Sequence, residues 1–269
     1  MNKEINGLHP DIIFFTTTLG AILLPFCRTK ARKIYESHLA RNFNPFNKLF
    51  FLTELRAERI VCLTSGDEKE YKYAKRVDII PNYINDVKSY VEDYSVKKAI
   101  AVGRLEYQKG FDILIDCWKE IAKQYPDWKL DIYGEGSCRE ELQRQINSLQ
   151  LGDKIKICGR NNNIIDVYPL YSLHLMTSRY EGLPMTLIEA QSCGLSSVVF
   201  DYQYGASDIV SNGHNGLIIE QGNRKLFIEA AMKMMSSKEL RKEYGINALE
   251  IVKRFSKENI FKKWIKLIT

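Results

Sequence analysis

The sequence predicts an α/β protein with parallel β-sheets, and two features of the chain carry this prediction. From residue 97 onward, six strand-like apolar runs each lead into a helical or turn pattern. Strands that alternate with helices in this way form parallel sheets covered on both faces. With 269 residues and 45% apolar content, the chain can form two modest α/β domains. The six runs are KKAIAVGRL, WKLDIYGEG, KIKICGR, SLHLMTS, SSVVFDY and GLIIE.

The chain before residue 85 predicts only two or three strands. IIFFTTTLGAILLPF (residues 12–26) contains three threonines and a proline and is too short to span a bilayer, so it predicts a buried strand followed by a helix. RKIYESH predicts another strand, and residues 47–64 predict a helix that can run into a strand. Pro81 ends a strand-like run, so IIPNYIND and the polar residues after it predict the connection between domains. The expected domains are residues 1–84 and 85–250, followed by an amphipathic helix within residues 251–269.

Charge and cysteine usage favour a cytoplasmic protein that binds no nucleic acid. The net charge is +6, but the lysines and arginines have acidic neighbours and no recognition motif with interleaved aromatic residues is present. The sequence after Met1 lacks the pattern of a secretory signal. The six cysteines show no C-x-x-C spacing, which favours free thiols in a reducing cytosol, and no spacing of His, Cys or carboxylates predicts a metal site.

One basic cluster has two possible interpretations. CRTKARK (residues 27–33), with Arg41 and Lys48 after it, can be a patch that faces an anionic membrane surface. It can equally be a solvated helix end.

The strongest candidate site is the segment SRYEGLPMTLIEAQSCG, in which Glu181 and Glu189 stand eight positions apart. Glu181 follows the strand-like run LHLMTS, and ligands of open α/β sheets bind at the carboxyl ends of strands. Pro184 suits the start of a helix, so free backbone N–H groups there can hold an anion. The groups expected to do so belong to Met185, Thr186 and Leu187. Two carboxylates around an anion site suit a ligand that is anionic in the middle and rich in hydroxyls at both ends, such as a nucleotide sugar.

A second strand-to-helix turn supplies cations for the same ligand. AIAVGRL ends in Gly103 and Arg104, and Lys109 precedes an amphipathic helix. The guanidinium of an arginine can contact two phosphate oxygens at once, while a lysine ammonium acts as a mobile point charge. Together they could neutralise a departing diphosphate, although a solvated basic turn would have the same sequence.

With these two segments, the sequence resembles the retaining transferases of glycosyltransferase family 4, which have the GT-B fold. The resemblance covers the chain from residue 8 onward and rests on the order of IPNYIND, VGRLEYQKG, IYGEGSCREEL, ICGR, the E-x7-E segment and NGHNGLII. It implies an α/β fold of the GT-B type, in which two Rossmann-like domains face a cleft. It also implies that the final helix packs back on the first domain.

The resemblance assigns roles to individual residues. Arg104 and Lys109 would hold the donor diphosphate, Glu181 the hydroxyls of the transferred sugar, and Glu189 the ribose. His38 matches a position near the donor sugar, although a structural histidine is equally expected there. Catalysis is expected from Glu181, Lys109, Arg104 and His38. Donor binding is expected from Gly103, Arg104, Lys109, Gly134, Gly136, Arg160 at the base, Glu181, Gly182, Leu183, Pro184, Met185, Thr186, Leu187 and Glu189.

The implied reaction is front-face substitution, in which the leaving diphosphate helps to deprotonate the acceptor hydroxyl. No cofactor or metal is expected apart from the nucleotide-sugar donor. The donor is expected to be a UDP-sugar, although the phosphate-binding residues alone leave GDP and ADP open. The expected acceptor is a glycan or a lipid-linked glycan in bacterial polysaccharide assembly, which fits peripheral contact with the inner face of the membrane.

The amino terminus departs from the family pattern, because the opening βα units of a GT-B first domain are missing. A wrongly assigned start, a partner chain that completes the domain, or a decayed gene would each explain this. A donor-binding subunit or remnant is therefore the main alternative function, and a sugar-nucleotide epimerase is a weaker one. A dinucleotide-binding oxidoreductase is disfavoured because Arg139 stands where the third glycine of G-x-G-x-x-G belongs.

Overall fold

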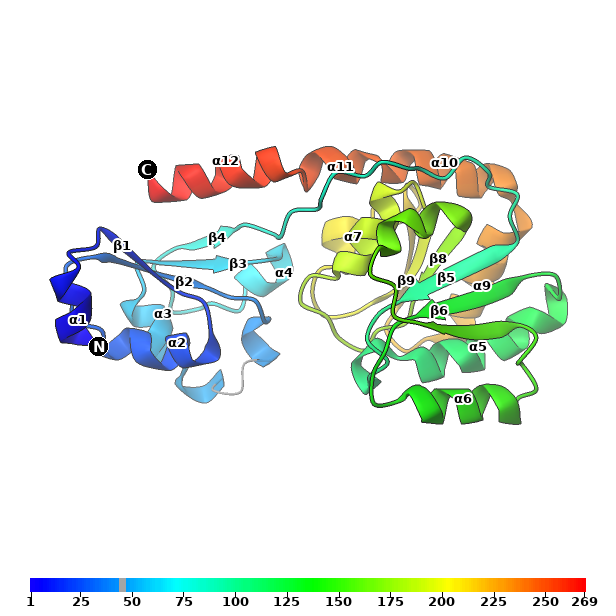
Figure 1. Cartoon of the computed structure of the whole chain (residues 1–269), viewed down its shortest axis with the longest axis horizontal. Helices are drawn as coiled ribbons and strands as arrows, with labels where there is room; N and C mark the ends of the chain where they lie inside the picture. Colours follow the sequence, from blue (N-terminus) through cyan, green and yellow to red (C-terminus); the bar gives the residue numbers. More distant parts are fainter. Residues whose placement is uncertain (44–46) are drawn as a thin grey trace. The chain divides into compact units, whose positions relative to one another are not determined.

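The protein is described by a computed structural model that covers residues 1–43 and 47–269. It divides into two compact units, which are described separately. The first contains Met1–Tyr83 and Lys257–Thr269, and the second contains Ile84–Ser256 (Figure 1).

The first unit is built on a parallel sheet of four strands in the order β1-β2-β3-β4. The expectation of two or three strands was therefore wrong. Val77–Ile79, within the strand-like run that ends before Pro81, forms the fourth strand at the edge of the sheet. The strand and helix expected within residues 12–26 are present, but the strand is not buried as expected, since Phe15 alone of its four residues is buried. The strands are β1 (Ile12–Phe15), β2 (Arg32–Glu36), β3 (Arg59–Cys62) and β4 (Val77–Ile79).

Short helices and one long helix complete this unit. The final helix, α12, packs on one face of the sheet, where Ile260 and Leu267 join Ile34 and Val61 in a buried cluster. The Arg32 guanidinium donates hydrogen bonds to the carbonyls of Leu267 and Ile268 at the end of this helix. The helices are α1 (Asn2–Gly7), α2 (Thr18–Leu23), η1 (Leu24–Phe26), η2 (Arg41–Phe43), η3 (Asn47–Leu49), α3 (Phe51–Arg56), α4 (Ser65–Glu68) and α12 (Lys257–Ile268).

The second unit contains a parallel sheet of six strands in the order β10-β9-β8-β5-β6-β7. The six strands predicted from residue 97 onward are all present. They are β5 (Lys98–Val102), β6 (Lys129–Tyr133), β7 (Ile155–Gly159), β8 (Leu173–Met176), β9 (Ser197–Asp201) and β10 (Gly216–Glu220).

Both faces of this sheet are buried. Ala99 and Ala101 of β5 point into the larger apolar core, whereas Ile100 between them belongs to a cluster on the opposite face. The helices are η4 (Tyr107–Lys109), α5 (Phe111–Gln124), α6 (Arg139–Ser148), η5 (Ile164–Asp166), η6 (Tyr168–Leu170), α7 (Met185–Ser192), α8 (Ala206–Ile209), α9 (Arg224–Ser236), α10 (Lys238–Ala248) and α11 (Glu250–Arg254).

The strand order changes direction between β5 and β8. The chain runs from β5 outward through β6 to β7 and then returns, so that β8 pairs with β5 on its other side. Loops that leave the carboxyl ends of two such strands diverge and form a crevice between them, which is the usual ligand site of open α/β sheets.

Candidate active site at the carboxyl ends of β5 and β8

Two loops meet at this change of strand order, and a glycine permits their contact. Gly110, at the start of α5, has φ +64°, and a Cβ added to it would lie 2.2 Å from the carbonyl oxygen of Thr177. The Thr177 hydroxyl donates to the Gly110 carbonyl at 2.8 Å. The loop after β5, with Gly103, Arg104 and Lys109, is therefore held against the loop after β8, which carries Glu181.

Lys109 and Glu181 form an ion pair that is almost completely shielded from solvent. Lys109 Nζ lies 2.6 Å from Glu181 Oε1, and the side chains are 12% and 5% exposed. A buried carboxylate is costly unless a charged or hydrogen-bonding partner compensates it. The two predicted residues thus stabilise one another, although they stand 72 positions apart in the sequence.

Gln108 connects this pair to Arg104 and is a residue that the sequence analysis missed. Its Nε2 donates to Glu181 Oε2 at 3.3 Å and to the Tyr180 carbonyl at 2.9 Å. Its Oε1 accepts a hydrogen bond from the Arg104 guanidinium at 2.9 Å. The only signal in the sequence was its place between Arg104 and Lys109, which does not reveal contacts with the loop after β8.

A second, outer contact ties the same two loops together. The Arg179 guanidinium donates to both carboxylate oxygens of Asp112 at 2.8 and 2.6 Å, and its carbon lies 3.8 Å from the centre of the Tyr107 ring. Burial alone would raise the pKa of Asp112, but the hydrogen bonds and charge of Arg179 lower it. The bidentate geometry makes this a well-ordered link.

Helix α7 begins at the expected place, with one correction. Pro184 is its N-cap, so the first helical residue is Met185. The N–H of Leu187 is not free as expected, because it donates to the Pro184 carbonyl at 3.1 Å. Within the described residues, the N–H groups of Met185 and Thr186 have no acceptor. Gly182 and Leu183 form the turn that leads from Glu181 to this helix start.

Thr186 adds a side-chain donor that the sequence analysis did not identify. Its hydroxyl oxygen is buried and has no hydrogen-bond partner among the described residues. Buried hydroxyls are normally hydrogen-bonded, so an orphan of this kind beside free N–H groups suits an anionic ligand.

Glu189 lies on α7, one turn beyond the helix start, beside a second residue that was missed. The fully buried Tyr168 donates its hydroxyl hydrogen bond to the Thr186 carbonyl at 3.1 Å and reaches Glu189 Oε2 at 3.5 Å. Burial raises the pKa of Glu189, and the hydrogen bond from Tyr168 opposes this shift. The carboxylate therefore has unused acceptor capacity in a partly apolar setting.

Four predicted residues line one pocket of about 280 Å³ on the β5 and β6 side of the crevice. Gly134 is required there, because a Cβ would lie 1.8 Å from the Gly103 carbonyl oxygen, and Gly136 similarly approaches the Leu105 carbonyl. The lining residues are Val102, Gly103, Arg104, Tyr133, Gly134, Glu135, Arg160, Asn161 and Ile164.

Residues 84–250, which include these loops, match the family model described as Glycosyl transferases group 1. The chain belongs to this family. The assignment rests on the unit that contains all of the site residues described above.

The group 1 glycosyl transferase has relatives in bacterial glycan synthesis. It is 33% identical over 218 residues to the amylovoran biosynthesis glycosyltransferase AmsD of Erwinia amylovora. The match covers 77% of this chain and 61% of AmsD. It is 28% identical over 244 residues to the poly(ribitol-phosphate) alpha-N-acetylglucosaminyltransferase of Staphylococcus aureus, covering 90% of this chain and 48% of the relative. The chain thus spans about half to three fifths of the length of these relatives.

Its fold agrees with that of solved GT-B enzymes. The structure of Anabaena Alr3699/HepE in complex with UDP superposes on this chain with a TM-score of 0.88 and 18% identity. The match covers 99% of this chain and 80% of the HepE chain. The expected α/β fold of the GT-B type is thereby confirmed.

Other predicted residues of this group 1 glycosyl transferase lie in its first unit. His38 follows β2, is half exposed, and has Nε2 3.7 Å from Glu36 Oε1. It is not among the residues that the second unit brings together. Arg41 cannot belong to an exposed basic patch, because it is buried and donates to Glu54 at 2.7 Å.

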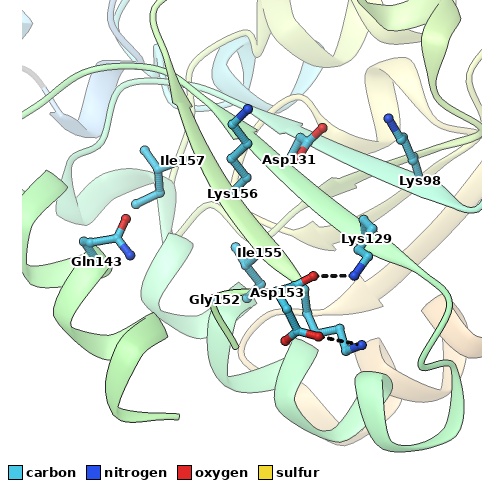
Figure 2. A pocket seen from close by; sticks show the side chains of 10 residues that line it. Lys98, Lys129, Asp131, Gln143, Gly152, Asp153, Ile155, Lys156 and Ile157 are labelled. Carbon is cyan, nitrogen blue, oxygen red and sulfur yellow. Dashed lines mark hydrogen bonds and ion pairs between the residues drawn. The ribbon is translucent and has the colours of Figure 1, made fainter. Parts of the chain in front are cut away.

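A larger pocket of about 470 Å³ lies elsewhere in the second unit (Figure 2). Lys98, Lys129 and Ile155 on its wall stand at the amino-terminal ends of β5, β6 and β7, whereas the candidate site occupies the carboxyl ends. Two of its lysines are already engaged, since Lys129 donates to the Asp153 carbonyl and Lys154 pairs with the Asp153 carboxylate. None of the predicted site residues lines it.

Among residues 1–43 and 47–269, no group of three or more His, Cys, Asp or Glu residues could hold a metal ion. None of the helices in the same ranges is long and apolar enough to cross a membrane.

Proposed function

We propose that this chain is a retaining glycosyltransferase of family 4 that transfers a sugar from a UDP-sugar to a glycan acceptor. The observation that carries this proposal is the shielded ion pair of Lys109 and Glu181, joined through Gln108 to Arg104 at the change of strand order. This arrangement supports a donor site in which cations, a carboxylate and the start of α7 would surround one diphosphate.

The diphosphate of the donor would contact Arg104, Lys109 and the start of α7. Arg104 is exposed and uses one of its guanidinium nitrogens for Gln108, which leaves other donors for phosphate oxygens. The N–H groups of Met185 and Thr186, together with the Thr186 hydroxyl, would donate from the opposite side. These groups would replace a divalent cation in charge neutralisation.

The two ends of the donor would contact the two carboxylates. Glu181 has lone pairs beyond those used by Lys109 and Gln108, so it can accept hydrogen bonds from the hydroxyls of the transferred sugar. Glu189 would accept from the ribose hydroxyls, and Arg160 in the adjoining pocket would contact the base.

Catalysis would then depend on position and charge. The departing diphosphate would accept the proton of the acceptor hydroxyl on the same face of the sugar, which retains the anomeric configuration. Arg104 and Lys109 would stabilise the negative charge that develops on the diphosphate. Glu181 would orient the sugar and would not act as a nucleophile.

The names of the relatives support a polymeric acceptor. One is a glycosyltransferase of amylovoran biosynthesis, and another transfers N-acetylglucosamine to poly(ribitol-phosphate). We propose a glycan or lipid-linked glycan as the acceptor, with the first unit in contact with an anionic bilayer that presents it.

A donor-binding subunit is the second candidate function. The proposed donor residues other than His38 lie in the second unit, so donor binding does not require that this chain also bind an acceptor. In that case the chain would bind UDP-sugar but transfer no sugar without another polypeptide.

Calorimetric titration with UDP, with GDP and ADP as comparators, tests the donor site. We expect saturable binding that is tightest for UDP. Release of UDP from a UDP-sugar, measured with and without a polyol-phosphate acceptor, then separates a transferase from a binding subunit. Absence of binding to all three nucleotides would contradict both functions.

A further inference from the structure

We propose that Gln108 is a positioning residue that keeps Arg104 available for the donor diphosphate by standing between its guanidinium and the Glu181 carboxylate. This inference rests on the proposed donor site. It adds to that site a residue whose side chain is uncharged and which needs no direct contact with the donor.

The hydrogen bonds fix the orientation of the Gln108 amide. Its nitrogen lies against two acceptors, the Tyr180 carbonyl and Glu181 Oε2, while its oxygen lies against the Arg104 guanidinium. If the amide were rotated by 180°, its NH2 group would face the N–H groups of Arg104 and its oxygen would face the Glu181 carboxylate. Neither contact is a hydrogen bond, so only one orientation is favourable. The bonds also join residues 72 and 73 positions apart, from the loop after β5 to the loop after β8.

An uncharged amide at this place has a specific consequence. Glu181 is 4% exposed and already pairs with Lys109, and Arg104 is exposed on the same turn as Gln108. A direct ion pair between Arg104 and Glu181 would occupy the donors that a diphosphate needs. Gln108 accepts one hydrogen bond from Arg104 without adding a negative charge beside it, which favours an anionic ligand there.

Two substitutions of similar size separate this role from simple packing. Gln108→Met fills the space but makes no hydrogen bond with Arg104 or Glu181. Gln108→Glu places a carboxylate beside Arg104, where it pairs with the guanidinium, and next to Glu181, where it is repelled. Gln143→Met and Gln143→Glu are matched controls, because Gln143 is exposed on α6 and makes one hydrogen bond, to Asn147.

The test is calorimetric affinity for UDP and for uridine at about pH 8, with each variant compared with the unsubstituted protein. We expect Gln108→Met to weaken UDP binding about tenfold while uridine affinity changes less than about twofold. Gln108→Glu should weaken UDP binding further than Gln108→Met, because the added carboxylate pairs with Arg104 and repels the diphosphate. The Gln143 variants should match the unsubstituted protein.

Three results would overturn the inference. UDP affinity of both Gln108 variants within twofold of the unsubstituted protein would show that the amide has no positioning role. Equal losses for UDP and uridine, or a Gln108→Glu loss of UDP affinity no larger than that of Gln108→Met, would show general disruption of the loop. If the unsubstituted protein does not bind UDP, the proposed donor site itself fails, and the inference fails with it.

Discussion

The ion pair of Lys109 and Glu181 makes a prediction at the scale of single residues. Lys109→Met should leave the nearly buried Glu181 without a cation, so the protein should lose about 3 kcal/mol of stability and bind UDP poorly. The double variant Lys109→Met/Glu181→Gln should recover most of that stability but not UDP binding. Thermal unfolding and calorimetry provide the two measurements.

Lys97→Met is the matched control for this prediction. Lys97 pairs with Asp127 at 3.1 Å, but these side chains are 57% and 73% exposed, so the change should cost less than about 1 kcal/mol. Restored UDP binding in the double variant would show that Lys109 contributes to stability and not to UDP binding.

Glu189 makes a second residue-scale prediction. Glu189→Gln should weaken binding of UDP and uridine to a similar extent, by about 1.5 to 3 kcal/mol, because both ligands carry the ribose. This differs from the Gln108 variants, which should affect UDP alone. Tyr168→Phe should show a smaller loss, since the Tyr168 hydroxyl donates to the Thr186 carbonyl at 3.1 Å and lies farther from the Glu189 carboxylate, at 3.5 Å. A loss confined to UDP would move Glu189 from the ribose to the diphosphate.

At this scale, local sequence revealed residues within a turn but not the contacts between turns. The order of Arg104 and Lys109 before an amphipathic helix, and of Glu181 before Pro184, could be seen in short segments. Gln108 could not be identified, because its hydrogen bonds depend on a loop more than 70 positions away. The free N–H expected at Leu187 was wrong because this N–H donates to the carbonyl of the N-cap residue, Pro184, at 3.1 Å.

At the scale of elements, strand β8 contains a buried histidine that predicts a pH dependence of stability. His174 is fully buried, its Nδ1 lies 3.2 Å from Ser197 Oγ, and burial lowers its pKa to about 3. Because the pKa is lower in the folded state than in the unfolded state, the unfolded chain binds the proton more readily. Stability is therefore fully present above about pH 6.5 and should fall by up to about 1.4 kcal/mol per pH unit below it.

The measurement is the free energy of unfolding in urea from pH 7.5 to 5 for the unsubstituted protein and for His174→Asn. The asparagine retains a polar partner for Ser197 without a titrating group. The variant should be less stable throughout but should lose less additional stability as the pH falls. Parallel pH profiles for the two proteins would exclude His174 as the source.

Strand prediction succeeded where apolar runs were long and failed where they were short. The six strands of the second unit each contain at least three apolar residues and a clear boundary, and all six are present. Val77–Ile79 has an aspartate at its centre and forms a strand because it pairs with β3. The run before Pro81 was strand-like, but the count of two or three strands did not include it, because its pairing with β3 cannot be read from local sequence.

At the scale of the whole molecule, the exposed surface of the first unit predicts binding to anionic membranes. Phe26, Leu49 and Leu52 surround an apolar pocket of about 230 Å³ between α2 and α3, and Leu19 and Leu55 are also exposed on these helices. Residues 12–35 contain no acidic residue. Exposed basic side chains adjoin the apolar ones in sequence, namely Arg28, Lys30, Lys48 and Arg56.

This composition suits a bilayer surface, because apolar side chains can enter the interface while lysines and arginines contact anionic headgroups. Vesicle co-sedimentation should show binding to vesicles rich in the anionic lipid phosphatidylglycerol. Binding to pure phosphatidylcholine should be much weaker, and added salt should reduce binding to the anionic vesicles. Phe26→Asp/Leu49→Asp should abolish binding, whereas Ile246→Asp, at an exposed position of the second unit, should not. If vesicles do not bind and the double variant instead converts a dimer to a monomer, the surface is a protein interface and the membrane prediction is wrong.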